Sequence, residues 1–136
     1  ETQMAVIPNT LTSIPGIGPV YASGLIAEIG DVNRFDNEAA LAKYAGLTWT
    51  RHQSGDYESS NQQLIHGGNK FLRYYFCQAA NKVRMHDPDY ASYYISKLKE
   101  VRKTPHKRAL VLTARKLVRL VYVLLRDGRL YQIQHK

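Results

Sequence analysis

Residues 104–128 read TPHKRALVLTARKLVRLVYVLLRDG, a stretch with the apolar period of an amphipathic helix. Pro105 suits the first helical position, where its missing N–H would have no partner. Gly128 is typical of the residue that ends a helix. The stretch therefore predicts one long helix from residue 105 to about residue 127. Its apolar side consists of Leu110, Ala114, Leu117, Val121 and Leu125.

The polar side of this helix carries four arginines in one row. At a helical rotation of about 100° per residue, they fall within about 40° of one another. A row of guanidinium groups fits the phosphates of a nucleic acid, but the solvated face of an ordinary amphipathic helix carries the same pattern. Both interpretations stay open at this point. The row consists of Arg108, Arg115, Arg119 and Arg126.

The rest of the chain predicts further helices, because no alternation of apolar and polar residues typical of a strand persists. We expect an all-α fold, a small helical domain with a long polar loop and a basic C-terminal helix. Caps and breakers set the expected helices. Two short helices are expected within residues 11–30, and a third over 38–44, capped by Asp36 or Asn37. A fourth helix is expected over 69–85. A fifth begins at Pro88, is capped by Asp87 and ends before a basic loop at 99–103.

Helical spacing also indicates which side chains are buried. On the 69–85 helix the expected apolar face includes Phe71 and Tyr75, and most of the ten tyrosines fall on such faces, which favours the core. The tail beyond Gly128 is expected to be frayed.

Length and composition exclude several classes of protein. A chain of 136 residues fits one domain, and its single cysteine excludes an internal disulfide and a cysteine-based zinc site. The five histidines lack the spacing of metal ligands, so no metal site is expected in this chain. No long apolar run and no secretory signal is present, which predicts a cytoplasmic location without membrane contact. The first residue is Glu1 rather than Met, which predicts a piece excised from a longer protein, although processing produces the same kind of end.

The charge is strongly positive and unevenly distributed. The net charge is +8, but the residues up to Gly46 carry two basic and five acidic side chains. The positive charge therefore belongs to the part from Leu47 onward. Such a balance is expected of a protein that binds a polyanion such as nucleic acid, although a merely basic solvated surface has the same composition.

The sequence Ile14-Pro15-Gly16-Ile17-Gly18-Pro19 resembles the turn of a helix-hairpin-helix motif. Its two glycines allow a close backbone approach to a phosphate, and free N–H groups at the start of the next helix face the anion. The candidate backbone-binding residues are Gly16, Ile17 and Gly18. The same hairpin also serves as plain packing in other proteins, so both roles stay open.

Residues 47–66 show no sustained period and are rich in polar side chains, including Gln53-Ser54-Gly55. Long irregular segments in small domains tend to be functional. Arg51, His52, His66, Lys70 and Arg73 could all reach a phosphate near Ser54, although spacing alone does not prove it. Arg51, Lys70 and Arg73 are the candidate phosphate clamps because of their charge and proximity. A serine followed by glycine is nevertheless more often a turn than a nucleophile.

An ordered series of motifs is more specific than any of these features. The glycine hairpin is followed by Tyr44-Ala45-Gly46-Leu47-Thr48, by Gln53-Ser54-Gly55, by Gly67-Gly68-Asn69-Lys70-Phe71-Leu72-Arg73 and by the basic helix. Over nearly the whole chain, this series closely resembles the C-terminal domain of the IS110, IS116 and IS902 insertion-sequence transposases. The departure from the family pattern is Ile65-His66, where members often carry Ser or Thr and then Lys.

The resemblance implies a DNA recombinase guided by a bridge RNA. It implies that Ser54 attacks a DNA phosphate and forms a covalent phosphoserine link, which strand exchange later reseals. It also implies a missing N-terminal RuvC-like domain, whose DEDD carboxylates bind magnesium, and a tetrameric active complex. Residues 1–35 would be the helix-hairpin-helix part and residues 36–136 the serine-bearing part, inactive without the N-terminal domain. The alternative is a binding module for DNA or RNA without chemistry of its own.

Overall fold

The computed structural model describes residues 9–48, 68–100 and 104–132. Every regular element in these ranges is helical, so the all-α prediction is confirmed. None of the described helices is long and apolar enough to cross a membrane. The elements are α2 (Asn9–Thr12), α3 (Pro19–Ile29), the 3-10 helix η1 (Val32–Arg34), α4 (Glu38–Tyr44), α6 (Lys70–His86), α7 (Pro88–Leu98) and α8 (Pro105–Asp127).

The ends of α4, α7 and α8 carry the expected signals, whereas α2 begins at Asn9, before the segment expected from residue 11, and the 3-10 helix η1 was not predicted. Asn37 caps α4, since its side-chain oxygen accepts a hydrogen bond from the Ala40 N–H at 2.8 Å. Asp87 caps α7 in the same way and is followed by a proline at the first helical position. At the end of α8, Gly128 adopts the left-handed conformation with φ 64°.

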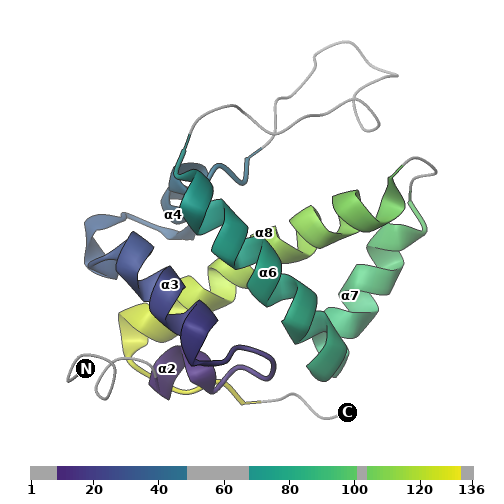
Figure 1. Cartoon of the computed structure of the whole chain (residues 1–136). Coiled ribbons are helices and arrows are strands. Elements are labelled where there is room, and N and C mark those ends of the chain that lie inside the picture. Colours follow the sequence, from purple (N-terminus) through teal and green to yellow (C-terminus); the bar gives the residue numbers. More distant parts are fainter. Residues whose placement is uncertain (1–8, 49–67, 101–103, 133–136) are drawn as a thin grey trace.

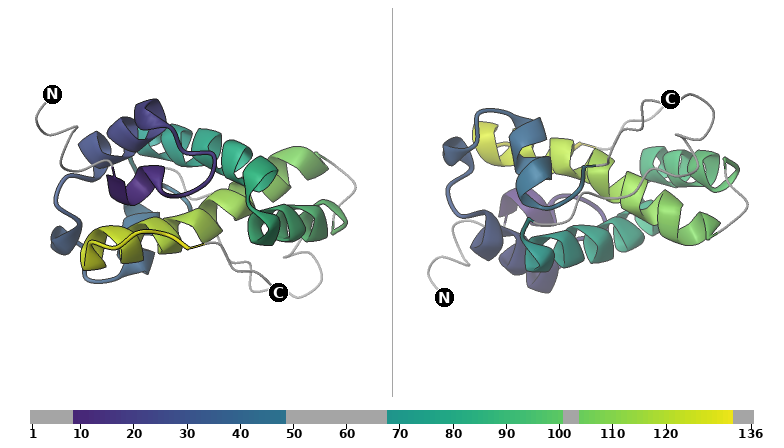
Figure 2. Two further views of the ribbon diagram at one scale, coloured as in Figure 1. Left: turned by 90° about the horizontal axis from the view of Figure 1, so that it is seen from below. Right: turned by 90° about the horizontal axis from the view of Figure 1, so that it is seen from above.

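The helices form two layers with further elements at the edges. Figure 1 shows α6 crossing α8, with α3 beside α6 and α7 on the other side. In Figure 2, α3 and α6 form one layer and α8 the second, while α2 and α4 lie on opposite faces of the molecule. The start of α6 and the end of α4 therefore come to the same end of the domain.

One hydrophobic core joins all of these helices. Leu25 of α3, Phe76 of α6 and Leu117 of α8 are fully buried within it. Burial of one such side chain contributes about 1.5–3 kcal/mol to stability. Because Leu25 and Phe76 lie in the same cluster, the core crosses the boundary that the sequence suggests at residue 35.

Two glycines bring the N-terminal part very close to α6. A Cβ atom on Gly16, where φ is +98°, would lie 2.7 Å from the carbonyl oxygen of Lys82. A Cβ atom on Gly24 would lie 2.5 Å from the ring of Tyr75. Neither space admits a side chain, so both glycines are needed for the packing of the turn and of α3 against α6.

Phe71 is not buried as the sequence predicted. It is 60% exposed, whereas Leu72 and Phe76 of the same helix are fully buried. At about 100° per residue, Phe71 lies roughly 120° away from the middle of the buried side of α6. The buried stripe is therefore narrower than the apolar face that the sequence suggested.

The prediction of a frayed tail is wrong for the residues as far as Tyr131. The Tyr131 backbone N–H donates to Ser13 Oγ at 2.8 Å, and its phenol donates to Asp87 Oδ2 at 2.5 Å. Asp87 is 1% exposed and uses its other carboxylate oxygen to cap α7. Burial raises the pKa of the Tyr131 phenol, and the hydrogen bond to Asp87 raises it further.

We expect Tyr131→Phe to lower the free energy of unfolding by about 1–3 kcal/mol at neutral pH, because a buried carboxylate loses a donor. The raised pKa adds a pH dependence. Above the ordinary tyrosine value of 10.0 the unfolded state releases its proton first, so the stability contributed by this phenol is lost as the pH rises. The variant should therefore lose less stability than the parent in alkaline solution. Urea unfolding at neutral and alkaline pH measures both effects.

Tyr93→Phe is a suitable control, since its half-buried ring lies 5.3 Å from Lys97 Nζ and its hydroxyl forms no hydrogen bond with the described residues. Its unfolding midpoint should stay near that of the parent. An unchanged midpoint for Tyr131→Phe would show that the hydrogen bond from the Tyr131 phenol to Asp87 contributes no stability.

Candidate functional site

The described chain stops at Thr48 and resumes at Gly68, and backbone contacts hold these two places together. The Asn69 N–H donates to the Tyr44 carbonyl oxygen at 2.6 Å. A Cβ atom on Gly68, where φ is +77°, would lie 2.7 Å from the backbone nitrogen of Gly46. The described residues on either side of residues 49–67 therefore lie together, and we name this place the loop base and define it as residues 44–48 and 68–69.

The predicted nucleophile Ser54 and the predicted phosphate clamp Arg51 fall within residues 49–67, outside the described residues. The departure at Ile65-His66 falls there too. The structure describes only the residues that flank this segment, up to Thr48 and from Gly68 onward.

Asn69 connects three helices at the loop base. Its side-chain oxygen caps α6 by accepting hydrogen bonds from the N–H groups of Phe71 at 2.9 Å and Leu72 at 3.0 Å. Its side-chain amide donates to Glu28 Oε1 of α3 at 2.8 Å and to the Tyr44 phenol oxygen of α4 at 3.4 Å. One side chain thus fixes the start of α6 relative to α3 and α4.

A cation lies beside this junction. The Arg34 guanidinium is 4.5 Å from the ring centroid of Phe35 and 4.7 Å from that of Tyr44, and its Nε donates to the Ile29 carbonyl oxygen at 2.9 Å. Arg34 and then Asn69 lower the pKa of the Tyr44 phenol. Sequence reasoning missed the roles of Arg34, Tyr44 and Asn69 at the loop base. Two sequence signals could have indicated these roles: the asparagine just before the α6 helix, which is a typical cap, and the motif Tyr44-Ala45-Gly46-Leu47-Thr48.

The start of α6 presents cationic and aromatic side chains next to the loop base. Lys70 is exposed, with its Nζ 5.6 Å from the ring centroid of Phe71, and Arg73 is half-buried. The whole of α6 contains four Lys or Arg residues and no Asp or Glu. The predicted clamps Lys70 and Arg73 therefore lie next to the loop base.

The four arginines of α8 differ in their surroundings. Arg115 forms a two-pronged ion pair with Glu38 of α4, at 2.6 and 3.2 Å, and Arg126 pairs with its neighbour Asp127. Arg108 is half-buried, and its Nε is buried without a hydrogen-bond partner in the described part of the chain. Arg119 is exposed, and none of the described carboxylates pairs with it.

The glycine turn is open on one side only. Gly16 packs on α6, Ile17 is 4% exposed, and the Ile17 N–H donates to the Ile14 carbonyl oxygen at 3.1 Å. Gly18 is exposed, with no atom within 4 Å of the place where a Cβ would be. It precedes α3 without a side-chain cap, so the first N–H groups of this helix lack a capping side chain. An anion could approach this turn from the Gly18 side.

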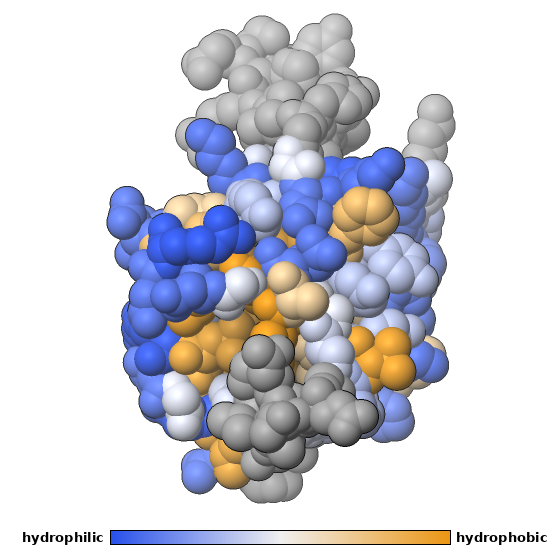
Figure 3. All heavy atoms as spheres, turned by 60° about the vertical axis from the view of Figure 1, so that its left-hand side comes forward, coloured by the Kyte–Doolittle hydropathy of each residue, from blue (hydrophilic) through white to orange (hydrophobic). Residues whose placement is uncertain are grey.

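Hydrophilic side chains dominate the upper part of the face in Figure 3, while hydrophobic ones gather in its middle. The upper end is the end of the domain to which α4 and the start of α6 belong (Figure 1). On this face, the end of the domain that contains the loop base is therefore mainly polar.

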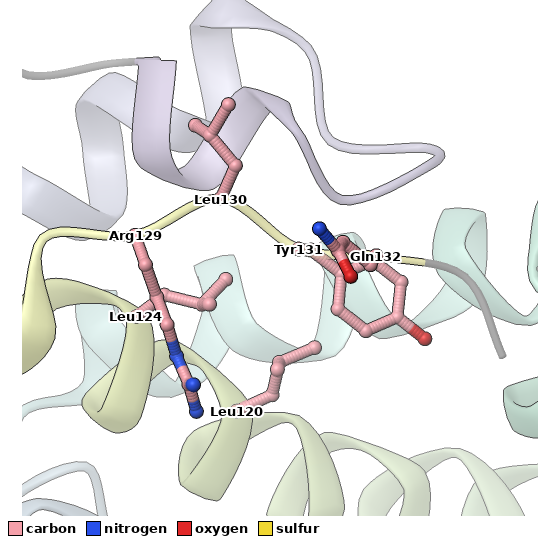
Figure 4. A pocket seen from close by; sticks show the side chains of 6 residues that line it. All are labelled: Leu120, Leu124, Arg129, Leu130, Tyr131 and Gln132. Atoms are coloured by element: carbon pink, nitrogen blue, oxygen red, sulfur yellow. The ribbon is translucent and has the colours of Figure 1, made fainter.

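A pocket of about 410 Å³ lies elsewhere, between α8 and the C-terminal segment. Figure 4 shows Leu120 and Leu124 of α8 facing this segment, with Arg129 alongside and Leu130 turned toward the opposite side. The one tyrosine that lines the pocket, Tyr131, already donates a hydrogen bond to Asp87. No acid or nucleophile is free in its lining. In the described ranges, moreover, no three His, Cys, Asp or Glu side chains are grouped to hold a metal ion.

Comparison with known proteins identifies the family. A model of the transposase IS116/IS110/IS902 family matches residues 9–95. The chain belongs to this family. The match includes the glycine turn, the loop base, α6 and most of α7.

Individual relatives agree with this assignment. The chain is 34% identical over 122 residues to the insertion element IS110 uncharacterized 43.6 kDa protein of Streptomyces coelicolor, covering 90% of this chain and 29% of that protein. It is 30% identical to the pilin gene-inverting protein of Moraxella bovis, covering 89% and 37%. It is 29% identical to the transposase for insertion sequence element IS1111A of Coxiella burnetii, covering 88% and 33%. The chain thus spans about a third of the length of these relatives.

The roles of Asn69 can be separated by substitution. We expect Asn69→Ala to lower the free energy of unfolding by about 1–2 kcal/mol, because α6 loses its cap. Asn69→Asp keeps the cap acceptor but places a carboxylate against Glu28, so it should also destabilise. Adding Glu28→Gln should restore stability in the Asp variant, since the new amide can donate to Asp. Urea unfolding midpoints of the four proteins test this order.

Glu28→Gln in the parent background is the matched control, because a glutamine oxygen can still accept from the Asn69 amide. It should leave the midpoint nearly unchanged. If Glu28→Gln fails to improve the Asp variant, Asn69 and Glu28 are not coupled across the loop base.

Proposed function

We propose that this chain is the serine-bearing, DNA-binding part of a transposase that moves an insertion sequence. The family match over residues 9–95 carries the proposal, because it includes the segment with Ser54 and both sides of the loop base. Relatives named as a transposase and as a pilin gene-inverting protein support action on DNA.

In the proposed reaction, Ser54 Oγ forms a bond to the phosphorus of a DNA phosphodiester. The bond from that phosphorus to the oxygen of one strand end breaks, and the leaving hydroxyl takes up a proton, while the serine proton passes to a base. Attack by the hydroxyl of an exchanged strand reverses these steps and releases the serine. A serine hydroxyl is a weak nucleophile, so it needs a base and cations on the phosphate.

The described residues offer part of this environment. Lys70 and Arg73 stand at the loop base, and Arg51 belongs to the same segment as Ser54. The hydrogen bond from the Asn69 N–H to the Tyr44 carbonyl oxygen holds together the described residues that flank the segment containing Ser54. In this proposal the phosphate that Ser54 attacks is bound by Lys70 and Arg73 at the start of α6.

The remaining parts of the proposal come from the family resemblance. By this resemblance, magnesium would be held by the DEDD carboxylates of an N-terminal domain. A bridge RNA, self-association and a cytoplasmic location belong to the same proposal.

Ser54→Ala in the full-length protein, with its bridge RNA and magnesium, should abolish strand transfer while leaving DNA affinity within about twofold. The reason is that the hydroxyl forms the covalent link but contributes little to binding. Denaturation of the parent reaction followed by mass spectrometry should find a nucleotide adduct on Ser54.

Ser59→Ala is the matched control in the same segment and should keep full activity. Undiminished strand transfer by Ser54→Ala, or an adduct on a tyrosine, would remove the nucleophile assignment and leave a binding module.

A second prediction concerns the arginines of α8. Arg119→Ala should weaken binding to duplex DNA and reduce the salt slope of log K by roughly one, the effect of one lost phosphate contact. Arg115→Ala should instead lower the free energy of unfolding by about 1 kcal/mol, because Glu38 loses its partner. Fluorescence anisotropy over a salt series and urea unfolding measure the two effects.

Lys43→Ala, at an exposed basic residue of α4, controls for the loss of one charge. This variant should change neither the salt slope of log K for duplex DNA nor the free energy of unfolding appreciably. An Arg119→Ala slope equal to that of the parent would show that this residue contacts no phosphate.

A further inference from the structure

We propose that Phe71 and Tyr74 form a stacking surface for unpaired bases of a nucleic-acid strand at the loop base. The inference rests on the proposed function and adds contacts to bases to the contacts with the nucleic-acid backbone that Lys70 and Arg73 would make. The ligand is defined by its chemistry, an unpaired nucleobase beside its own phosphate.

The exposure of these two rings is unusual in this domain. Phe71 is 60% exposed and Tyr74 is 57% exposed, whereas Tyr90, Tyr94 and Tyr122 are buried. Residues three apart in a helix lie on the same side, so the two rings occupy neighbouring positions on the first two turns of α6. Large aromatic rings left open to water lose the free energy that burial would give, so a ligand that covers them is favoured.

The Tyr74 ring is supported from within the domain. It meets the Tyr75 ring edge-on, with the centroids 5.7 Å apart and an interplanar angle of 68°. Tyr75 in turn packs against Gly24 so closely that no Cβ would fit there. A ring held by such a neighbour loses little conformational entropy when a base stacks on it.

The charges around the rings favour a nucleic acid over a protein partner. Lys70 and Arg73 flank Phe71 and Tyr74 on a helix that has no carboxylate. Protein interfaces tend to be depleted of lysine, whereas proteins that bind single strands combine aromatic rings with a positively charged track for the backbone. The same four residues therefore offer stacking for bases and charge for phosphates.

The position of the rings matches the proposed chemistry. Phe71 lies two residues after Asn69, so a strand bound to Lys70 for attack by Ser54 would carry its bases past the two rings. Strand exchange requires bases near the break to leave their old partners before they pair again. A stacking surface at this place would hold such bases during the exchange.

The test uses the 136-residue chain and fluorescence anisotropy with three labelled probes of equal length: single-stranded DNA, single-stranded RNA and duplex DNA. Phe71→Leu and Tyr74→Leu keep an apolar side chain and remove the π face. Each should weaken single-strand binding by roughly 5- to 150-fold, the range for loss of one stacked base, with an unchanged salt slope and a change in duplex affinity below about twofold. Phe71→Trp should retain single-strand affinity.

Two variants separate stacking from other effects. Lys70→Ala should weaken all three probes and lower the salt slope on single strands by about 0.7, since it removes a phosphate contact. Met85→Ala removes another exposed apolar side chain of α6 and should change nothing. Thermal unfolding of each variant shows that its fold is retained.

The outcomes distinguish the inference from the function on which it rests. Selective loss of single-strand binding in both Leu variants supports the inference, and the probe that loses more affinity identifies the strand as DNA or RNA. Parent-like binding by both Leu variants, or an equal loss on duplex DNA, overturns the stacking surface and leaves the backbone contacts in place. If the parent chain binds none of the probes, the proposed DNA-binding role fails together with the inference.

Discussion

The contact between the glycine turn and the backbone of α6 is the constraint on which the rest of the domain depends. Because nothing larger than a hydrogen fits at Gly16, the turn sits directly on α6 near Lys82, and α3 must follow along the same helix. Gly24 of α3 makes a second close approach to α6, at Tyr75. With α3 held in this way, Glu28 comes within hydrogen-bond distance of Asn69 at the start of α6. The loop base is thus a consequence of packing that occurs at the other end of α6.

The acidic part of the chain, up to Gly46, mainly packs against and pairs with the basic part from Leu47 onward. Two of its carboxylates are used inside the domain: Glu28 accepts from Asn69, and Glu38 pairs with Arg115. Ser13 accepts from the backbone of Tyr131, far along the chain. These contacts reduce the negative charge that this stretch presents to a surface proposed to bind a polyanion. Lys70 and Arg119, by contrast, stay exposed.

Local signals predicted most of the fold. Prolines after Gly18, Asp87 and Thr104 begin three helices where the sequence indicates, since they act within one turn and need no partner. Side-chain partners across the fold were not predictable in the same way. The docking of Tyr131 depends on the buried carboxylate of Asp87, and the pairing of Arg115 depends on where α4 packs, so helical periodicity alone gave a frayed tail and a uniform arginine row. The segment of Ser54 lies outside the described residues, and its assignment comes from motif order and family membership.

Helical periodicity does not show which neighbours cover a helix, and this explains why Phe71 was expected in the core but lies outside it. Periodicity shows which side chains are apolar, but only the packing of neighbours decides how wide the buried stripe is. On α6 the neighbours α3, α7 and α8 cover the side that carries Leu72 and Phe76 and leave Phe71 and Tyr74 uncovered. An apolar ring that no helix covers, placed between cations and beside the loop base, is better explained by a ligand than by stability. The failure of the pattern at this residue therefore points to function.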